Sequence, residues 1–243
     1  SGRIDLQRAR LIAETGAVAE SVQWFAGPGQ PVGPTEIPLE LFAARIEALR
    51  RETDRQVIVG TSFGAEAALA TAALACRVDA VVAFAPSDVV WAGVRPDGSQ
   101  TSHWSLDGRA LAFVPLDQQW APSTDPPEYR GLYQASRRKA PDAAEAACIP
   151  VERLPELVLV VGGDDRVWPS DEHAEAIQLR RRRAGLDTQI ASAARAGHRA
   201  ILPGEEPVTA GVRMARGGTP HADSELGRQA AEAMRRLIGG SPA

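Results

Sequence analysis

Short, continuous runs of apolar residues alternate along the chain with longer stretches of helical periodicity. Runs such as Val57-Ile58-Val59 and Leu157-Val158-Leu159-Val160-Val161 are typical of parallel strands, whose residues are apolar on both faces because helices cover each side of the sheet. The pattern predicts strands at 18–25, 57–60, 79–84, 157–161 and 188–193.

The intervening stretches have apolar residues at helical spacing. Leu39, Phe42, Ile46 and Leu49, for example, would lie on one face of a helix. Because strands and helices alternate, we expect an α/β fold with a mostly parallel sheet flanked by helices, and a single domain over residues 1–243. Helices are predicted at 4–14, 38–51, 63–76, 170–184 and 224–238.

The sequence from Pro86 to Pro155 loses this periodicity. We interpret it as an irregular insert over the candidate site, with a short helix near 143–147. A loop of this length within a compact domain is usually functional. Its aromatic residues have two open interpretations: they line a pocket, or they only pack the insert onto the sheet. The tryptophans concerned are Trp91, Trp104 and Trp120.

The most informative motif follows the predicted strand at 57–60. Gly60-Thr61-Ser62-Phe63-Gly64 joins this strand to an Ala-rich helix, and Ser62 stands at the apex of the turn. A strand, a sharp turn and a helix, with Ser at the apex, form the nucleophile elbow of α/β-hydrolases. We expect both glycines to be needed because neighbouring backbone comes too close for a Cβ atom. Taken alone, the motif also fits an ordinary strand-to-helix turn.

Two later features stand in the order of this fold, which is Ser, then an acid, then His. Asp164 and Asp165 follow the strand at 157–161, and His198 follows the strand at 188–193. Sites in parallel sheets lie outside the carboxyl ends of the strands, so these residues are expected to meet. We choose Asp165 as the acid, since the residue directly after Gly-Gly more often closes the turn with its side chain. Asp164 stays the alternative.

These residues predict nucleophilic catalysis at an acyl carbonyl. Ser62 attacks the carbonyl, His198 takes up and returns the proton, and Asp165 orients the imidazole. The backbone N–H of Phe63 is expected to be one oxyanion donor, because it belongs to the residue after the nucleophile. The second donor is expected from the loop after an earlier strand, and Gly2 is our candidate.

The other histidines are weaker candidates for the base. His173 lies in the acidic start of a helix, which suits a solvated or capping role, and His221 precedes the last helix. His103 lies in the insert, where it can at most line a pocket. Glu66, one turn into the helix after Ser62, either complements the helix dipole or anchors the insert by a hydrogen bond.

Four motifs occur in order along the chain. They are Gly60-Thr61-Ser62-Phe63-Gly64-Ala65-Glu66, Ile149-Pro150-Val151-Glu152, Gly162-Gly163-Asp164-Asp165-Arg166-Val167-Trp168-Pro169-Ser170 and Ala196-Gly197-His198. Together they resemble the catalytic domain of the acyl-CoA thioesterase / bile acid-CoA:amino acid N-acyltransferase family. The likeness covers nearly the whole chain and is greatest to bacterial members without the extra N-terminal domain.

The resemblance implies an α/β-hydrolase fold, a coenzyme A thioester substrate and a triad of Ser62, Asp165 and His198. Members that transfer acyl groups to amino acids often have Cys as the nucleophile, so Ser62 is associated with hydrolysis. Many relatives have Lys where this chain has Phe63, which makes the local pocket more apolar. The leading hypothesis is therefore a serine hydrolase, an acyl-CoA thioesterase. The alternatives are a carboxylesterase or dienelactone-hydrolase-like enzyme, an acyl-CoA N-acyltransferase, and a non-catalytic binding subunit with this fold.

The resemblance also implies a strand that the printed sequence lacks. In this fold, the strand before the first long helix lies between those predicted at 18–25 and 57–60, and its loop supplies the second oxyanion donor. Without it, its neighbours would have unpaired backbone groups, each costing about 1–3 kcal/mol when buried. We predict that an upstream N-terminal segment, or a separate chain, supplies this central strand. The alternative is that the other strands close up and leave a defective site.

Composition and charge argue against several other classes. The net charge is −4 and nothing indicates a nucleic-acid-binding face. The basic run Arg180–Arg183 suits a solvated helix end, and a contact to coenzyme A phosphates is the alternative. No apolar run approaches the length of a membrane span, and with no signal peptide the expected location is the cytoplasm. Cys76 and Cys148 have no metal-binding spacing, and we expect no cofactor or metal.

Overall fold

The computed structural model describes residue 2, residues 4–207 and residues 212–239. Its centre is a parallel four-stranded sheet in the order β2, β3, β8, β9. The four strands confirm the predictions at 57–60, 79–84, 157–161 and 188–193, with small shifts at their ends. Their bounds are β2 Val57–Thr61, β3 Ala80–Phe84, β8 Glu156–Gly162 and β9 Gln189–Ala193.

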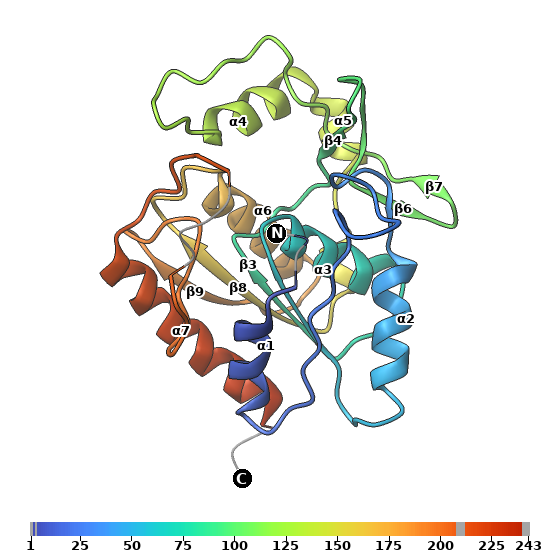
Figure 1. The fold of residues 1–243 in the computed structure, drawn as a ribbon, viewed down its shortest axis with the longest axis vertical. Helices are drawn as coiled ribbons and strands as arrows, with labels where there is room; N and C mark the ends of the chain where they lie inside the picture. The colour runs from blue at the N-terminus through green and yellow to red at the C-terminus, as the bar shows by residue number, and fades with distance from the viewer. Residues whose placement is uncertain (1, 3, 208–211, 240–243) are drawn as a thin grey trace.

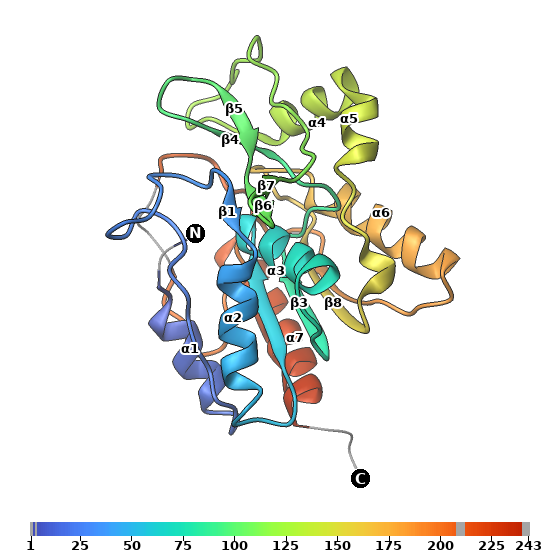
Figure 2. The same cartoon turned by 90° about the vertical axis from the view of Figure 1, so that its right-hand side faces the viewer.

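Helices cover both faces of this sheet (Figures 1 and 2). Alternate residues of a strand point to opposite faces, so Val81 and Val82 of β3 belong to different apolar clusters. Val81 packs with α2, α3 and α6, and Val82 packs with α1 and α7. The chain is thus an α/β protein of three layers, as the alternating pattern predicts. The helices are α1 Leu6–Ala13, α2 Glu40–Leu49, α3 Phe63–Leu74, α6 Ser170–Arg183 and α7 Pro220–Ile238.

The insert at 86–155 stands above the sheet in Figure 1 and carries more regular structure than its weak periodicity indicates. Strands β4 and β5 form a small antiparallel ribbon, and β6 pairs with both β1 and β7. The short helix predicted near 143–147 corresponds to α5, whereas α4 was not predicted. The elements are β1 Ile37–Pro38, β4 Ala92–Val94, β5 Gln100–Ser102, β6 Trp104–Leu106, β7 Arg109–Ala110, α4 Arg130–Lys139, α5 Pro141–Ala146 and η1 Val151–Arg153.

The strand predicted at 18–25 does not form. Residues 17–24 have no regular secondary structure, although the Trp24 side chain is buried in the core. The physical reason is that, among the described residues, no strand lies beside this segment to pair with it: a groove of about 700 Å³ is lined by both the segment and β2. The neighbouring segments therefore do not close up on one another.

The basic run at the end of α6 is not simply solvated. Arg181 is fully buried, and its guanidinium donates to the backbone carbonyls of Val151, Leu154, Pro155 and Asp187 at 2.7–2.9 Å. Its Nε also donates to Thr188 Oγ1 at 2.9 Å. This one side chain donates hydrogen bonds to the backbone carbonyls of the turns that lead into β8 and β9, and it holds the end of α6 against these turns. The prediction of a solvated helix end is wrong for Arg181 and holds for the exposed Arg183.

Replacing Arg181 with Lys is expected to lower the free energy of unfolding by about 3 kcal/mol, because a lysine cannot serve the same set of buried carbonyls. Denaturant unfolding of the variant would measure this loss. The matched control is Arg183→Lys, which should change stability by less than about 0.5 kcal/mol, as exposed substitutions usually do. Equal effects of the two substitutions would contradict the assigned role of Arg181.

Candidate active site

Ser62 lies in a strained turn between β2 and α3. Its backbone has φ 60° and ψ −124°, a conformation that costs a non-glycine residue about 1–3 kcal/mol. The turn is held from the sheet side, where the Ser62 N–H donates to the Phe84 carbonyl at 2.9 Å. A Cβ at Gly60 would lie 2.0 Å from the Gly64 carbonyl oxygen, so only glycine fits there. A Cβ at Gly64 would meet nothing within 4 Å, so the expectation that both glycines are required by local packing is wrong for Gly64.

Phe63 begins α3, and its N–H lies at the helix N-terminus, next to Ser62. Within the described residues, no backbone hydrogen bond uses this N–H, which leaves it available to an oxyanion. The Phe63 ring packs between His103, at a centroid distance of 4.3 Å, and Trp168, at 5.5 Å. The residue after the nucleophile is thus fixed by its side chain while its N–H stays free.

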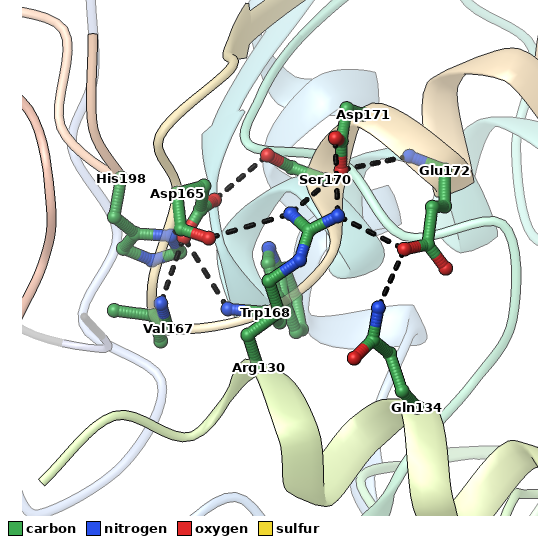
Figure 3. A network of polar contacts seen from close by, with 9 residues as sticks. All are labelled: Arg130, Gln134, Asp165, Val167, Trp168, Ser170, Asp171, Glu172 and His198. Atoms are coloured by element: carbon green, nitrogen blue, oxygen red, sulfur yellow. Dashed lines mark hydrogen bonds and ion pairs between the residues drawn. The ribbon is translucent and has the colours of Figure 1, made fainter. Parts of the chain in front are cut away.

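Asp165 is buried at the turn from β8 to α6 and accepts hydrogen bonds on both carboxylate oxygens (Figure 3). Oδ1 accepts from the backbone N–H groups of Val167 at 2.9 Å and Trp168 at 3.3 Å. Oδ2 accepts from Ser170 Oγ at 2.7 Å. This set of donors stabilises the ionised carboxylate in a buried position.

Oδ2 of Asp165 also lies 2.8 Å from His198 Nδ1. An ionised carboxylate can only accept, so Nδ1 carries the proton and Nε2 is the basic nitrogen of the neutral ring. The loop that carries His198 is itself held, since Gly197 N–H donates to Asp223 Oδ1 at 2.7 Å. His198 N–H donates to the Arg216 carbonyl at 2.9 Å. The imidazole is therefore oriented before any substrate binds.

Asp164, the alternative acid, points elsewhere. Its carboxylate accepts from Arg166 Nε at 3.0 Å and from the Gly218 N–H at 2.8 Å. Both bonds favour the charged form, with Arg166 the larger cause, and lower the pKa of Asp164. Asp164 thus joins the segment before α7 to the acid loop, while Asp165 contacts the histidine.

Ser62, Asp165 and His198 follow β2, β8 and β9, so the fold brings them to the same carboxyl edge of the sheet. The Asp165–His198 pair is in hydrogen-bond contact. Between Ser62 Oγ and His198 the described residues show no hydrogen bond. Such catalytic contacts are often long without substrate and tighten in the complex.

The insert is fixed to this edge at the acid loop. Arg130 of α4 bonds to the Asp165 carbonyl at 3.4 Å and pairs with Asp171 at 2.8 Å and Glu172 at 2.9 Å (Figure 3). Gln134, one turn further along α4, donates to Glu172 at 2.6 Å. Helix α4 is therefore held across the start of α6, beside the acid.

A second anchor of the insert is Glu66, which sequence reasoning left open between two roles. Its side chain is fully buried, and Oε1 accepts from the Trp91 N–H at 3.1 Å and from Trp104 Nε1 at 2.7 Å. The same oxygen lies 3.0 Å from His103 Nδ1. Glu66 therefore anchors the insert to the helix that begins after Ser62.

Two tryptophans of the insert are core residues: Trp104 packs in the main core over the sheet, and Trp91 packs among residues of the insert and against Trp168. Trp91 and Trp104 are fully buried, which favours the packing interpretation for both, and Trp120 is half-buried beside Tyr129. A further aromatic residue beside His198 is Trp168, which sequence reasoning did not single out. Its ring lies 6.0 Å from His198 and 5.5 Å from Tyr133. Its position in the sequence, three residues after Asp165, is the signal from which it could have been predicted to lie near the site.

The other histidines take structural positions. His173 is not solvated as expected: it is 1% exposed, and its Nδ1 lies 2.5 Å from Asp88 Oδ1. Arg137 of α4 binds the same carboxylate through both of its terminal nitrogens, at 2.6 and 2.9 Å. His221 lies in the first turn of α7 and is exposed, rather than preceding that helix.

Gly2, the candidate for the second oxyanion donor, lies against the segment before β1. Its carbonyl accepts from the Trp24 N–H at 3.1 Å, and its Cα packs on the Phe25 ring. No hydrogen bond of the described residues uses the Gly2 N–H. Its role as a donor stays a prediction.

Comparison with known proteins gives one family. The sequence model of the family described as BAAT / Acyl-CoA thioester hydrolase C terminal matches residues 37–224. No curated protein matches the chain significantly. Among the described residues, no cluster of side chains could hold a metal ion, and no helix has the length and apolar character to cross a membrane.

Two Asp–His pairs occur among the described residues, and matched substitutions distinguish their roles. His198→Ala is expected to lower any Ser62-dependent turnover by at least about 10³-fold, because it removes the oriented base. His173→Ala should leave turnover per folded molecule within about threefold and lower the unfolding free energy, because it breaks a buried pair. Turnover measured on folded protein, with unfolding curves alongside, checks both. A catalytic loss in His173→Ala as large as that in His198→Ala would contradict this assignment.

Asp88 makes the free energy of unfolding depend on pH in the acidic range. Burial opposes its ionisation, but the hydrogen bonds from His173 and Arg137 outweigh burial and hold the pKa of Asp88 well below 3.8. A carboxylate with a lowered folded-state pKa contributes stability above its unfolded pKa, and this is lost as the pH falls below that value. Asp88→Asn should therefore destabilise the protein by about 3 kcal/mol at pH 7, and the difference from the wild type should shrink below about pH 4. Urea unfolding as a function of pH, with the exposed Asp54→Asn as control, gives the measurement.

Proposed function

The chain belongs to the BAAT / Acyl-CoA thioester hydrolase C-terminal family, and from this premise we propose that it is a serine hydrolase that cleaves acyl-CoA thioesters. The observation that carries the proposal is the set of three residues at one edge of the sheet. Ser62 has the strained backbone of a nucleophile elbow, and His198 is bonded through Nδ1 to the buried Asp165. These features support a Ser-His-Asp mechanism rather than a binding role, because a binding subunit has no need of an oriented base.

In the first half of the proposed reaction, Ser62 Oγ attacks the thioester carbonyl carbon while His198 Nε2 takes the hydroxyl proton. The carbonyl oxygen becomes an oxyanion, which the Phe63 N–H stabilises together with a second donor, for which Gly2 is the candidate. Asp165 stabilises the imidazolium that forms. Collapse of the tetrahedral intermediate breaks the carbon–sulfur bond, and His198 returns its proton to the departing thiolate of coenzyme A.

In the second half, a water molecule attacks the acyl-enzyme ester. His198 Nε2 accepts the water proton. Collapse of the new intermediate then breaks the bond between the acyl carbon and Ser62 Oγ, His198 returns the proton to Ser62 Oγ, and the carboxylic acid is released. Transfer to an amine would require a bound acceptor that outcompetes water. The nucleophile here is Ser62, which favours hydrolysis over transfer.

The nature of the leaving group favours a thioester. A thiolate leaves readily, so most of the barrier lies in forming the oxyanion, and the preorganised Phe63 N–H acts at that step. The partly exposed ring of Phe63, directly after Ser62, suits an acyl chain better than a charged group.

A fluorophosphonate is expected to add covalently to Ser62, and acyl-CoA to be hydrolysed with release of free coenzyme A. Ser62→Ala should abolish the adduct and lower thioester hydrolysis by at least about 10³-fold. Intact-mass spectrometry with peptide mapping gives the first result, and thiol release gives the second. The matched control is Ser87→Ala, since Ser87 is buried outside the triad and bonds to Trp91.

Two comparisons separate the remaining functions. A rate on an oxygen ester that exceeds the rate on the coenzyme A thioester of the same acid would assign a carboxylesterase instead. An amide product formed in the presence of glycine or taurine would assign acyl transfer. A folded chain with an unreactive Ser62 and no thioester turnover would refute the hydrolase proposal.

A further inference from the structure

The nucleophile and the base of the proposed triad follow strands at opposite ends of the described sheet. In the order β2, β3, β8, β9, Ser62 follows the first strand and His198 follows the last, whereas Asp165 follows the strand next to β9. The hydrogen bond between Asp165 and His198 therefore fixes the base relative to the acid only. The position of the base relative to Ser62 depends on contacts between the end of β2 and the loop after β9.

One side chain of α1 bonds to both of these segments. The guanidinium of Arg8 donates through Nη1 to Thr61 Oγ1 at 3.0 Å and through Nη2 to the Ala200 carbonyl at 3.1 Å. Thr61 directly precedes Ser62, and Ala200 is the second residue after His198. A single planar group thus connects the end of β2 with the loop that carries the base.

The guanidinium of Arg8 is itself held in place by Glu205. Its Nε donates to Glu205 Oε1 at 3.0 Å and its Nη2 donates to Oε2 at 2.7 Å, a paired arrangement that fixes both the position and the plane of the group. Glu205 Oε2 also accepts from the Leu202 N–H at 2.9 Å, which holds the carboxylate within the segment that follows His198. The side chains of Arg8 and Glu205 are only 14% and 6% exposed, so water and salt screen this ion pair weakly.

Arg8 also contacts the residue that holds the backbone of Ser62. Its Cζ lies 4.8 Å from the centroid of the Phe84 ring, within the range of a cation–π interaction. The Phe84 carbonyl accepts the hydrogen bond from the Ser62 N–H. Arg8 therefore contacts the surroundings of the nucleophile at two points, through Thr61 and through Phe84.

The stability of α1 does not explain an arginine at this position. Arg8 is the third residue of the helix, near its N-terminus, where the helix dipole disfavours a cation. Its charge is neutralised by Glu205, which argues against a role in binding the phosphates of a coenzyme A substrate. A lysine has a single nitrogen and cannot match the two oxygens of Glu205 while also reaching Thr61 and Ala200. These observations favour a role that depends on the shape of the guanidinium.

We propose, on the basis of the function proposed above, that Arg8 is a positioning residue, which fixes the end of β2 relative to the His198 loop and thereby sets the distance from Ser62 Oγ to His198 Nε2. Arg8 takes no part in the proton transfers, because its hydrogen bonds go to Thr61, Ala200 and Glu205. Its removal should slow the attack of Ser62 on the carbonyl and leave substrate binding largely unchanged.

The substitution Arg8→Ala tests this role. We expect kcat for thioester hydrolysis and the rate of fluorophosphonate addition to Ser62 to fall by about 10²-fold, with KM within about threefold of the wild type. Added ethylguanidinium should raise both rates by at least about tenfold, because it supplies the planar donor group, whereas ethylammonium should not. The matched control Arg10→Ala removes an exposed arginine from the same helix and should leave both rates within about threefold of the wild type.

Thr61→Val is a second variant that removes only the hydrogen bond to the end of β2. It keeps the shape of the side chain and the pairing of Arg8 with Glu205, and it should lower the same two rates by about tenfold. Because both substitutions break the same contact, the double variant Arg8→Ala/Thr61→Val should be no slower than Arg8→Ala. If Arg8→Ala does not fold, Thr61→Val decides by itself, and wild-type rates in this variant would contradict the proposal.

Three kinetic results would overturn the proposed role of Arg8 and leave the hydrolase proposal intact. The first is a pair of rates in Arg8→Ala within about threefold of the wild type. The second is a raised KM with an unchanged kcat, which would mean that Arg8 binds the substrate. The third is a double variant in which the two losses multiply, which would mean that Arg8 and Thr61 act independently.

Crystal structures of the wild type and of Arg8→Ala give a readout that requires no activity. The distance from Ser62 Oγ to His198 Nε2 should be larger in the variant by at least about 0.5 Å, the tolerance within which catalytic groups must be held. An unchanged distance would refute the positioning role even if the wild type has no thioesterase activity. Failure of this proposal and failure of the hydrolase proposal are therefore distinguishable.

Discussion

A buried carboxylate must be surrounded by donors, and the loop from β8 to α6 is folded to supply them to Asp165. The donors are two backbone N–H groups, the Ser170 hydroxyl and the His198 ring. Because an unpaired buried charge costs several kcal/mol, the loop, the start of α6 and the histidine are coupled to the same group. The orientation of the His198 ring is thus a consequence of stabilising one buried anion.

A second buried carboxylate couples the insert to the helix that follows Ser62. Glu66 lies one turn after Ser62 on α3 and accepts from backbone and side-chain donors of the insert, on Trp91 and Trp104. Asp165 is connected to the same insert through Arg130, which bonds its carbonyl. The insert is therefore bonded both to the helix that follows Ser62 and to the loop of Asp165, which orients His198. A substitution that weakens these bonds would displace Ser62 and His198 together.

Local pattern was enough to predict the four strands of the sheet, because buried parallel strands are continuously apolar and their turns are short. It was also enough to predict that Ser62, Asp165 and His198 lie at one edge of the sheet. It failed where partners distant in sequence decide the outcome. Helix α4 has a polar sequence and is held by ion pairs to α6, and Arg181 is buried because distant carbonyls need a donor. Residues 18–25 have the composition of a strand, yet no strand forms without a partner to pair with.

The strained residue Ser62 directly follows β2, and β2 lines the groove, so the groove and the candidate site share one element. A residue held at positive φ persists only when its surroundings over-determine it, and β2 is the element that presents Ser62 to the solvent. In the described structure, β2 is held on one side by β3, through bonds that include the one from the Ser62 N–H. Its other side faces the groove. A neighbour paired with that side would hold β2 at both edges and restrict the turn at Ser62. The same free edge, left open, is a surface on which another chain can pair. Whatever pairs with the free edge of β2 would therefore restrict the turn at Ser62 and remove this pairing surface at the same time.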